Sequence, residues 1–201
     1  MRREICICAE IDTCRRALLP RTRVVILMHY RELLRTTNTG RLAQLALEGC
    51  EIRVRGRQGA PLPTEGVMDP GRHTFLLFPT PGARELTPEF VASLDKPVTL
   101  VVPDGTWGQA TKVAKRESFL HTVPRVTLVP AGPTRYGLRR GSREEGLATF
   151  EAIARALGAL EGRAIQHRLE DLFNLMVSRT LGSRGIRPVL PPQEPRDPTE
   201  L

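Results

Sequence analysis

The amino-acid sequence predicts an α/β fold, with a mostly parallel β-sheet that carries helices on both faces. Short apolar runs rich in β-branched residues recur along the chain, which is typical of buried strands. The segments between them repeat apolar residues at helical spacing. Strands that alternate with helices favour a parallel sheet, because each helix returns the chain to the end of the sheet from which it started.

Four of the apolar runs are predicted to be buried strands, and one further segment is predicted to be a strand near an edge. The run at 23–29 follows a proline and a basic turn, and the run at 74–79 is closed by a proline. Residues 51–56 alternate apolar with basic side chains, which suits an edge. The predicted strands are 23–29, 51–56, 74–79, 97–103 and 125–130.

Five helices are predicted from apolar periodicity and from capping residues. Asn38 or Thr39 is an N-cap candidate for the first helix. A Thr-Pro-Glu sequence at 87–89 begins the second, and Ser142 with Glu145 forms a capping box before the fourth. The first predicted helix starts near residue 39, the third follows a turn within 104–119, and the others span 87–94, 143–160 and 165–182.

The chain is predicted to hold one α/β domain with two appendages. Residues 1–22 form a cysteine-containing N-terminal segment, 23–185 form the domain, and 186–201 form a proline-rich, disordered tail. No apolar run approaches the length that crosses a bilayer, and the N-terminus lacks the apolar stretch of a secretory signal. We therefore expect a cytoplasmic protein with no membrane partner.

The formal net charge of +8 is compatible with a nucleic-acid partner. Nearly all of the basic charge is arginine, which pairs with phosphate in a two-pronged geometry and stacks on bases. A GC-rich genome would also enrich arginine without any functional reason, so charge alone does not decide between these interpretations.

The familiar nucleotide-binding and hydrolase motifs are missing: the sequence has no Walker loop, G-x-G-x-x-G, H-E-x-x-H or G-x-S-x-G. Ligands in α/β folds bind where loops leave the carboxyl ends of strands. Three predicted loops qualify, namely Phe78-Pro79, Pro103-Asp104-Gly105 and residues 130–142.

The sequence Asp104-Gly105-Thr106-Trp107 directly follows an apolar strand and contains the only tryptophan of the chain. A carboxylate at a strand end can be partly desolvated, where it accepts a proton or fixes a donor. Glycine allows close approach of a ligand, and an indole can stack on a base. The alternative is that Asp104 caps the next helix and that Trp107 belongs to the core.

Other segments supply further candidates for a site. His29 ends the first strand, and the hydroxyl- and amide-rich residues 36–41 open the next helix, whose N-terminus favours anions. Residues 135–140 interleave one aromatic with three arginines, a pattern found in RNA contacts. Thr149 and Glu151 lie in an otherwise apolar helix, and Glu151 is interpreted as a buried, partnered carboxylate rather than a solvated one.

Ordered blocks from Cys6 to about Leu160 resemble the DTW-domain proteins. The blocks are CICAEI, a strand ending in MH, TTNTGRLA, LLFP, VVPDGTW, PRVTL with RYGLR, and LATFEAIARAL. The Asp-x-Thr-Trp motif that names the family corresponds to Asp104, Thr106 and Trp107. The resemblance implies a SPOUT-like fold whose C-terminal part is tied into a trefoil knot that holds S-adenosylmethionine.

The resemblance also implies an enzyme that transfers the 3-amino-3-carboxypropyl group of S-adenosylmethionine to N3 of a uridine in tRNA and releases methylthioadenosine. We therefore expect Asp104, Thr106 and Trp107 to be catalytic, with Asp104 either removing the N3 proton or binding the amino group of the substrate. The expected cofactor pocket comprises Thr39, Phe78, Pro79, Pro103, Asp104, Gly105, Trp107, Tyr136, Thr149 and Glu151.

The expected partner is tRNA, bound by a monomer or a homodimer. Each basic residue assigned to the RNA could instead serve only solubility. The expected RNA contacts are Arg35, Arg41, Lys112, Lys115, Arg116, Arg139, Arg140 and Arg143.

Zinc is an open question for the cysteines of the N-terminal segment. Cys6, Cys8 and Cys14 could supply three thiolates to a zinc ion, or could be reduced cysteines with no ligand role. Family members commonly carry two further cysteines upstream of the C-x-C pair, and only Cys6 and Cys8 match here, which leaves a zinc site in doubt.

Two other functions compete with the leading one. The first is a SPOUT-type RNA methyltransferase, and the second is a non-catalytic RNA-binding or assembly factor. The retained Asp-Gly-Thr-Trp sequence argues against the second, since a pure binder needs no acid at a strand end.

Overall fold

The computed structural model describes residues 5–130, 134 and 146–186, and these residues form a six-stranded sheet in which every pairing is parallel. The strand order is β2-β1-β5-β3-β6-β4. This confirms the predicted α/β class. The strands are β1 (Arg23–His29), β2 (Glu51–Arg55), β3 (His73–Leu77), β4 (Arg84–Glu85), β5 (Val98–Asp104) and β6 (Arg125–Thr127).

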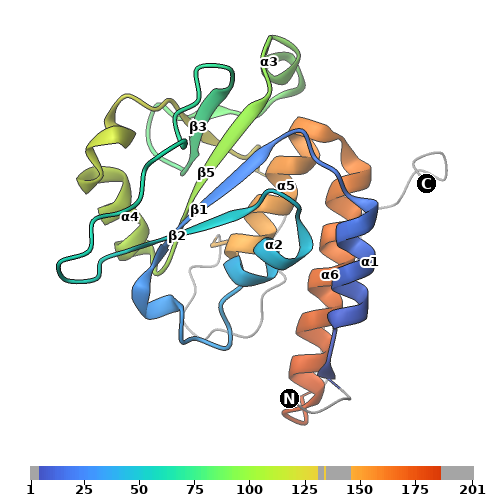
Figure 1. Ribbon diagram of the computed structural model, residues 1–201. Helices are drawn as coiled ribbons and strands as arrows, with labels where there is room; N and C mark the ends of the chain where they lie inside the picture. The colour runs from blue at the N-terminus through green and yellow to red at the C-terminus, as the bar shows by residue number, and fades with distance from the viewer. Residues whose placement is uncertain (1–4, 131–133, 135–145, 187–201) are drawn as a thin grey trace.

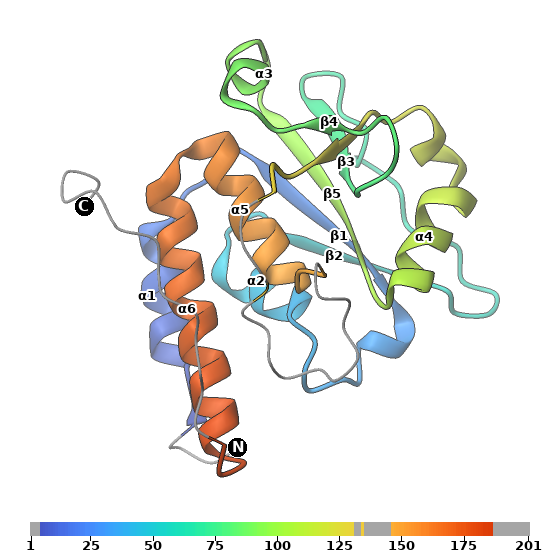
Figure 2. The same cartoon turned by 180° about the vertical axis from the view of Figure 1, so that it is seen from behind.

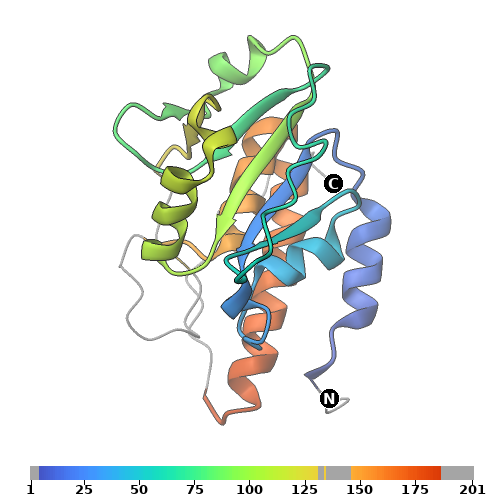
Figure 3. The same ribbon diagram turned by 60° about the vertical axis from the view of Figure 1, so that its left-hand side comes forward.

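Helices cover both faces of this sheet (Figures 1 and 2). Figure 3 shows α4 in front of the sheet, with α5 and α6 behind it. The helices are α1 (Cys8–Ala17), α2 (Gly40–Ala46), α3 (Pro88–Ala92), α4 (Trp107–Arg116), α5 (Thr149–Glu161) and α6 (Arg163–Gly182), with short 3-10 turns η2 (Tyr30–Glu32) and η3 (Ser118–His121). None of the described helices is both long and apolar enough to span a bilayer.

Strand β1 is buried on both faces because it lies inside the sheet. Val24, Ile26 and Met28 point into the larger core, which α1, α2, α5 and α6 share. Val25 and Leu27 point into the smaller core beneath α4. Two buried faces explain why this strand is a continuous apolar run rather than an alternating one. By contrast, β2 ends the sheet and is half-buried along its length, as predicted for an edge.

Helices α5 and α6 close the larger core. The rings of Phe150 and Phe173 stack with their centroids 5.5 Å apart, and both residues are buried. Gly158 of α5 lies against α6: a Cβ atom at this position would be 2.7 Å from Cβ of Gln166. The absence of a side chain at Gly158 therefore sets the spacing of the two helices.

Two predicted boundaries are wrong. The helix predicted to start at 143 begins only at Thr149, because the Glu151 carboxylate accepts a hydrogen bond from the backbone N–H of Ala148 and caps the helix there. The strand predicted to reach residue 130 ends at Thr127. Helix α1 and the two-residue β4 were not predicted at all.

The remaining structural expectations stay predictions. Ser142, Glu145 and residues 187–201 of the expected tail lie outside the described residues. The expected knot stays a prediction, since residues 131–133 and 135–145 also lie outside the described part of the chain. Helix α1 contributes Ile11 and Cys14 to the same core as the strands, while the division at residues 22 and 185 is untested.

We expect the substitution Gly158→Ala to lower stability by about 1–3 kcal/mol, because the added methyl group overpacks the contact between α5 and α6. Gly182→Ala is the matched control. Gly182 lies at the end of α6, an added Cβ there would have nothing within 4 Å, and alanine favours the helix. Urea denaturation followed by circular dichroism measures both. An unchanged midpoint for Gly158→Ala would show that the helices can move apart freely.

Candidate functional site

The strand order creates a topological switch point between β1 and β5. The chain leaves β1 towards β2 on one side, and it leaves β5 towards β6 on the other. Loops that leave neighbouring strands in opposite directions open a crevice at the carboxyl ends of those strands, where ligands bind in folds of this kind. Met28 and Asp104 are register partners at these ends, so Asp104 lies at the switch point.

The carboxylate of Asp104 is buried and held from two sides. Only 4% of the residue is exposed. Its Oδ2 accepts a hydrogen bond from the side-chain amide of Asn38 at 2.6 Å, and its Oδ1 accepts one from the hydroxyl of Thr149 at 2.5 Å. A buried carboxylate requires such partners because it has lost its hydration. We call Asp104, Asn38 and Thr149 the carboxylate clamp.

The clamp fixes the starts of two helices as well as the acid. Asn38 Oδ1 accepts a hydrogen bond from the backbone N–H of Arg41 at 3.0 Å and so caps α2, as one of the two predicted candidates. Thr39 is buried, and its hydroxyl accepts a hydrogen bond from the backbone N–H of Phe150 at 3.3 Å. A Cβ on Gly40 would lie 3.0 Å from Asp104 Oδ2, so this position has little room for a side chain.

The turn after β5 places Trp107 at the start of α4. The hydroxyl of Thr106 accepts a hydrogen bond from the backbone N–H of Gln109, and Gln109 Oε1 accepts one from the backbone N–H of Thr106 at 2.7 Å. This capping box means that Thr106, not Asp104, caps the helix. A Cβ on Gly105 would lie 2.8 Å from Gln109 Oε1. Trp107 is 39% exposed, so it is not a core residue.

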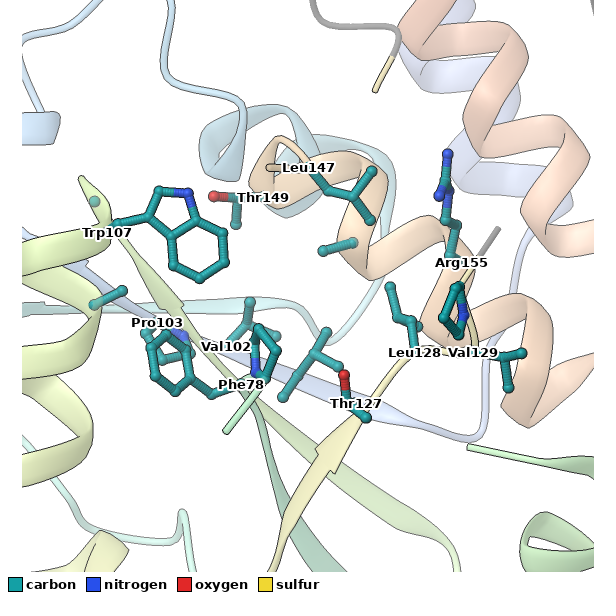
Figure 4. A pocket seen from close by; sticks show the side chains of 16 residues that line it. Phe78, Val102, Pro103, Trp107, Thr127, Leu128, Val129, Leu147, Thr149 and Arg155 are labelled. Carbon is teal, nitrogen blue, oxygen red and sulfur yellow. The ribbon is translucent and has the colours of Figure 1, made fainter. Parts of the chain in front are cut away.

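A cavity of about 640 Å³ opens at the carboxyl ends of β3, β5 and β6 (Figure 4). Trp107, Pro103 and Phe78 lie on one side of it, and Leu128, Val129 and Arg155 lie on the other. The rings of Phe78 and Trp107 are 6.1 Å apart between centroids. The lining residues are Leu77, Phe78, Pro79, Val102, Pro103, Gly105, Trp107, Ala110, Thr127, Leu128, Val129, Pro130, Leu147, Thr149, Ala152 and Arg155.

The structure brings most of the expected pocket residues together. Six of them line the cavity: Phe78, Pro79, Pro103, Gly105, Trp107 and Thr149. Thr39, Asp104 and Glu151 are buried next to it without lining it. Tyr136 lies outside the described residues.

Glu151 is a buried, partnered carboxylate, in agreement with its interpretation from the sequence. Only 4% of the residue is exposed, and its Oε2 accepts hydrogen bonds from the hydroxyl of Thr134 at 2.6 Å and from the backbone N–H of Ala148 at 2.9 Å. The Glu151 side chain therefore links Thr134, which follows β6 in the chain, to the start of α5.

Sequence reasoning missed two side chains of this site. Asn38 was considered as a helix cap and as part of the amide-rich segment 36–41, but its contact with Asp104 was not predicted. Arg155 lies six residues after Thr149 on α5 and lines the cavity. Ala152, which also lines the cavity, is three residues from each of them, and such three-residue steps along the helix were a usable signal.

The basic residues expected to contact RNA that lie in the described part of the chain are exposed, and they form two groups. Arg35 and Arg41 follow β1, and the Arg35 guanidinium pairs with buried Glu32 at 3.3 Å. The second group lies on α4 and comprises Lys112, Lys115 and Arg116. Arg139, Arg140 and Arg143 lie outside the described residues.

The cysteines divide into a surface pair and two core residues. Cys14 and Cys50 are buried, and burial raises the pKa of the Cys50 thiol to about 12. Cys6 is half-buried and Cys8 exposed. A hydrogen bond from the backbone N–H of Cys8 lowers the pKa of Cys6. No group of three or more metal-ligating side chains occurs within the described ranges, and Cys14 faces the core, not Cys6 and Cys8.

Comparisons with known proteins give a family and several relatives. A family model for the DTW domain matches residues 1–181. A Drosophila melanogaster protein named tRNA-uridine aminocarboxypropyltransferase 2 is 34% identical over 150 residues, which are 71% of this chain and 57% of that protein. The Mus musculus protein of the same name is 28% identical over 164 residues, 79% of this chain and 53% of that protein. The chain thus spans about half the length of these curated relatives.

Among solved structures, the SAM-dependent rRNA:acp-transferase Tsr3 from Vulcanisaeta distributa aligns over 84% of this chain and 80% of its own, at 16% identity and a TM-score of 0.49.

We expect Thr149→Val to lower stability by about 1–3 kcal/mol, because it removes the hydroxyl that donates to Asp104 and leaves a buried acceptor with one partner fewer. Thr149→Ser retains the hydroxyl and is the matched control. The two variants are compared by urea denaturation. If Thr149→Val is as stable as the unaltered protein, the hydrogen bond to Asp104 does not contribute to stability.

Alkylation should separate the four cysteines by burial and thiol pKa. We expect iodoacetamide to modify Cys6 and Cys8 in the native protein at neutral pH, with Cys6 faster because its lowered pKa gives more thiolate. Cys14 and Cys50 should react only in denaturant. Peptide mass spectrometry locates the label. Native labelling of Cys50 at the rate of Cys8 would contradict its burial.

Proposed function

The chain belongs to the DTW domain family, and we propose that it transfers the 3-amino-3-carboxypropyl group of S-adenosylmethionine to N3 of a uridine in tRNA. Its curated relatives carry the name of this activity. The observation that carries the proposal is the carboxylate clamp: a rigid, buried acid at the end of β5 stands beside a cavity at the carboxyl ends of parallel strands.

The residues of the cavity fit S-adenosylmethionine. Phe78 and Trp107 offer aromatic surfaces, which stack on a nucleobase and attract a sulfonium cation. Strand ends supply backbone N–H and C=O groups that can fix an adenine edge. When bound, S-adenosylmethionine supplies an electrophilic methylene next to sulfur, and the pocket must expose this carbon and cover the methyl group.

Asp104 would act on the acceptor through Thr149. The carboxylate does not line the cavity, whereas Thr149 does, and the Thr149 hydroxyl already donates to Asp104 Oδ1. The uridine N3 proton would pass to Thr149 Oγ1 as the threonine proton passes to Asp104 Oδ1. The N3 electron pair would then form the bond to the methylene, and the carbon–sulfur bond would break with its electrons on sulfur. The alternative role for Asp104 is to bind the amino group of the transferred arm.

The other expected properties belong to the same proposal. Thr106 would contribute by holding the turn, since its hydroxyl caps α4. The exposed basic residues after β1 and on α4 would contact the tRNA backbone. The SPOUT-like knot, the cytoplasmic location and the monomeric or dimeric state are proposed with it.

Two competing functions have distinct products. A SPOUT-type methyltransferase would add one methyl group to the RNA, and a non-catalytic RNA-binding factor would add nothing. The cavity favours a transferase over a pure binder, because it offers room for a small-molecule donor next to the clamped acid.

The test is mass spectrometry of nucleosides from bulk tRNA incubated with the purified protein and S-adenosylmethionine. We expect a uridine that is heavier by one aminocarboxypropyl group, and a rate about 10²–10⁴-fold lower for Asp104→Asn, the range of a lost general base. Thr106→Ser retains the capping hydroxyl and is the control. A methylated product would support the methyltransferase, and an undiminished rate in folded Asp104→Asn would exclude an acid–base role for Asp104.

A further inference from the structure

Three consecutive residues at the carboxyl end of β1 form a compact stack of flat groups. The rings of His29 and Tyr30 have centroids 4.9 Å apart and are inclined by 33°. The Arg31 guanidinium lies 5.7 Å from the centre of the Tyr30 ring, and its Nε donates a hydrogen bond to the Tyr30 hydroxyl at 3.0 Å. We call His29, Tyr30 and Arg31 the aromatic–arginine stack.

The stack is anchored to the body of the protein through His29. The Nδ1 atom of His29 accepts hydrogen bonds from the backbone N–H of Arg31 and from the side-chain amide of Gln109, each at 3.3 Å. Two donors on Nδ1 specify a neutral ring with its proton on Nε2. Burial, followed by the nearby charges of Arg55 and Arg31, lowers the pKa of His29, which is consistent with this neutral form. The base of the stack is therefore fixed.

The surroundings of the stack carry positive charge. Arg31, Arg55 and Lys112 each disfavour protonation of His29, and only Glu32 favours it. Arg55 is paired with Glu117 at 2.8 Å, and Glu32 is buried and paired with Arg35. Among the described charged groups that act on His29, the exposed ones are Arg31 and Lys112, and both are cationic. An anionic partner is favoured.

The stack and the cavity flank the same helix end. Gln109, which holds His29, lies in the first turn of α4, and the same turn begins with Trp107 on the cavity wall. Figures 1 and 2 both show the turn after β1 next to the start of α4. The chain then runs from the stack to Asn38 of the carboxylate clamp. A ligand that spans the start of α4 would contact both the stack and the cavity.

We propose that the aromatic–arginine stack is a platform for an unpaired RNA base that neighbours the target uridine. This proposal rests on the proposed function, because it assumes an RNA chain whose target base enters the cavity. Bases of single-stranded RNA stack on tyrosine rings and on guanidinium planes, and both surfaces stand here beside free cationic charge. Half-buried Tyr30 supplies the ring, and exposed Arg31 supplies both a flat surface and a phosphate partner.

The experiment measures binding of a fluorescently labelled uridine-rich single-stranded RNA and of a blunt RNA duplex by anisotropy, without S-adenosylmethionine. Tyr30→Ala should weaken single-strand binding about fivefold or more, the lower end of the loss of one base–aromatic stack. Duplex binding should not change, because paired bases are not available to the platform. Tyr30→Phe should bind the single strand as the unaltered protein does.

Salt dependence separates stacking from charge. Tyr30→Ala should leave the slope of log affinity against log salt unchanged, whereas Arg31→Ala should reduce it by about one phosphate contact. Arg16→Ala is the matched control, since it removes an exposed charge on α1 without touching the stack. Circular dichroism checks that each variant folds.

Several results would overturn the platform. One is single-strand binding by folded Tyr30→Ala equal to that of the unaltered protein, and another is equal weakening of single strand and duplex. Failure of the proposed function has a different signature: the unaltered protein would bind RNA yet transfer no aminocarboxypropyl group. Tight binding of an acidic peptide that competes equally with RNA would assign the stack to a protein partner instead.

Discussion

The arrangement of the site depends on one buried carboxylate. Asp104 ends β5, Asn38 precedes α2, and Thr149 begins α5, so the two hydrogen bonds to the acid tie three distant segments of the chain together. A buried charge without partners is costly, and the three segments therefore have to meet. The same contacts that stabilise the fold at this edge also orient the group to which we assign the proposed chemistry, so stability and the proposed activity would share one set of side chains.

The first turn of α4 has a comparable double role on the surface. Trp107 lines the cavity, while Gln109 closes the capping box with Thr106 and also reaches His29. The first turn of α4 thereby connects the wall of the cavity with the proposed RNA platform. Because a capped helix start is rigid, the distance between these two places is set by the protein before any ligand arrives.

Features that depend on neighbouring residues in the chain could be predicted from the sequence, whereas contacts between distant segments could not. The continuous apolar run of β1 predicted a strand buried on both faces, and Asp104 and Trp107 stood out at the end of another such run. The contact between Asn38 and Asp104 could not be predicted, because it requires β5 to lie beside β1, and strand order has no local signal. Helix α1 was missed because few of its residues face the core. The proposed chemistry came from the family resemblance rather than from periodicity or spacing.

The strand order also has a consequence for how the protein is made. Strand β1 can pair early with β2, but its other neighbour, β5, comes much later in the chain. Strand β3 precedes β5 in the chain and cannot join the sheet beside β1, because β5 lies between them. The hydrogen bond from Thr149 to Asp104 can form only later still, because Thr149 lies 45 residues further along the chain. Contacts between distant residues form slowly, because each closes a long loop. During synthesis, the nascent chain can thus hold a partly ordered sheet while the site is still absent, and the proposed binding of S-adenosylmethionine would become possible only after α5 has left the ribosome.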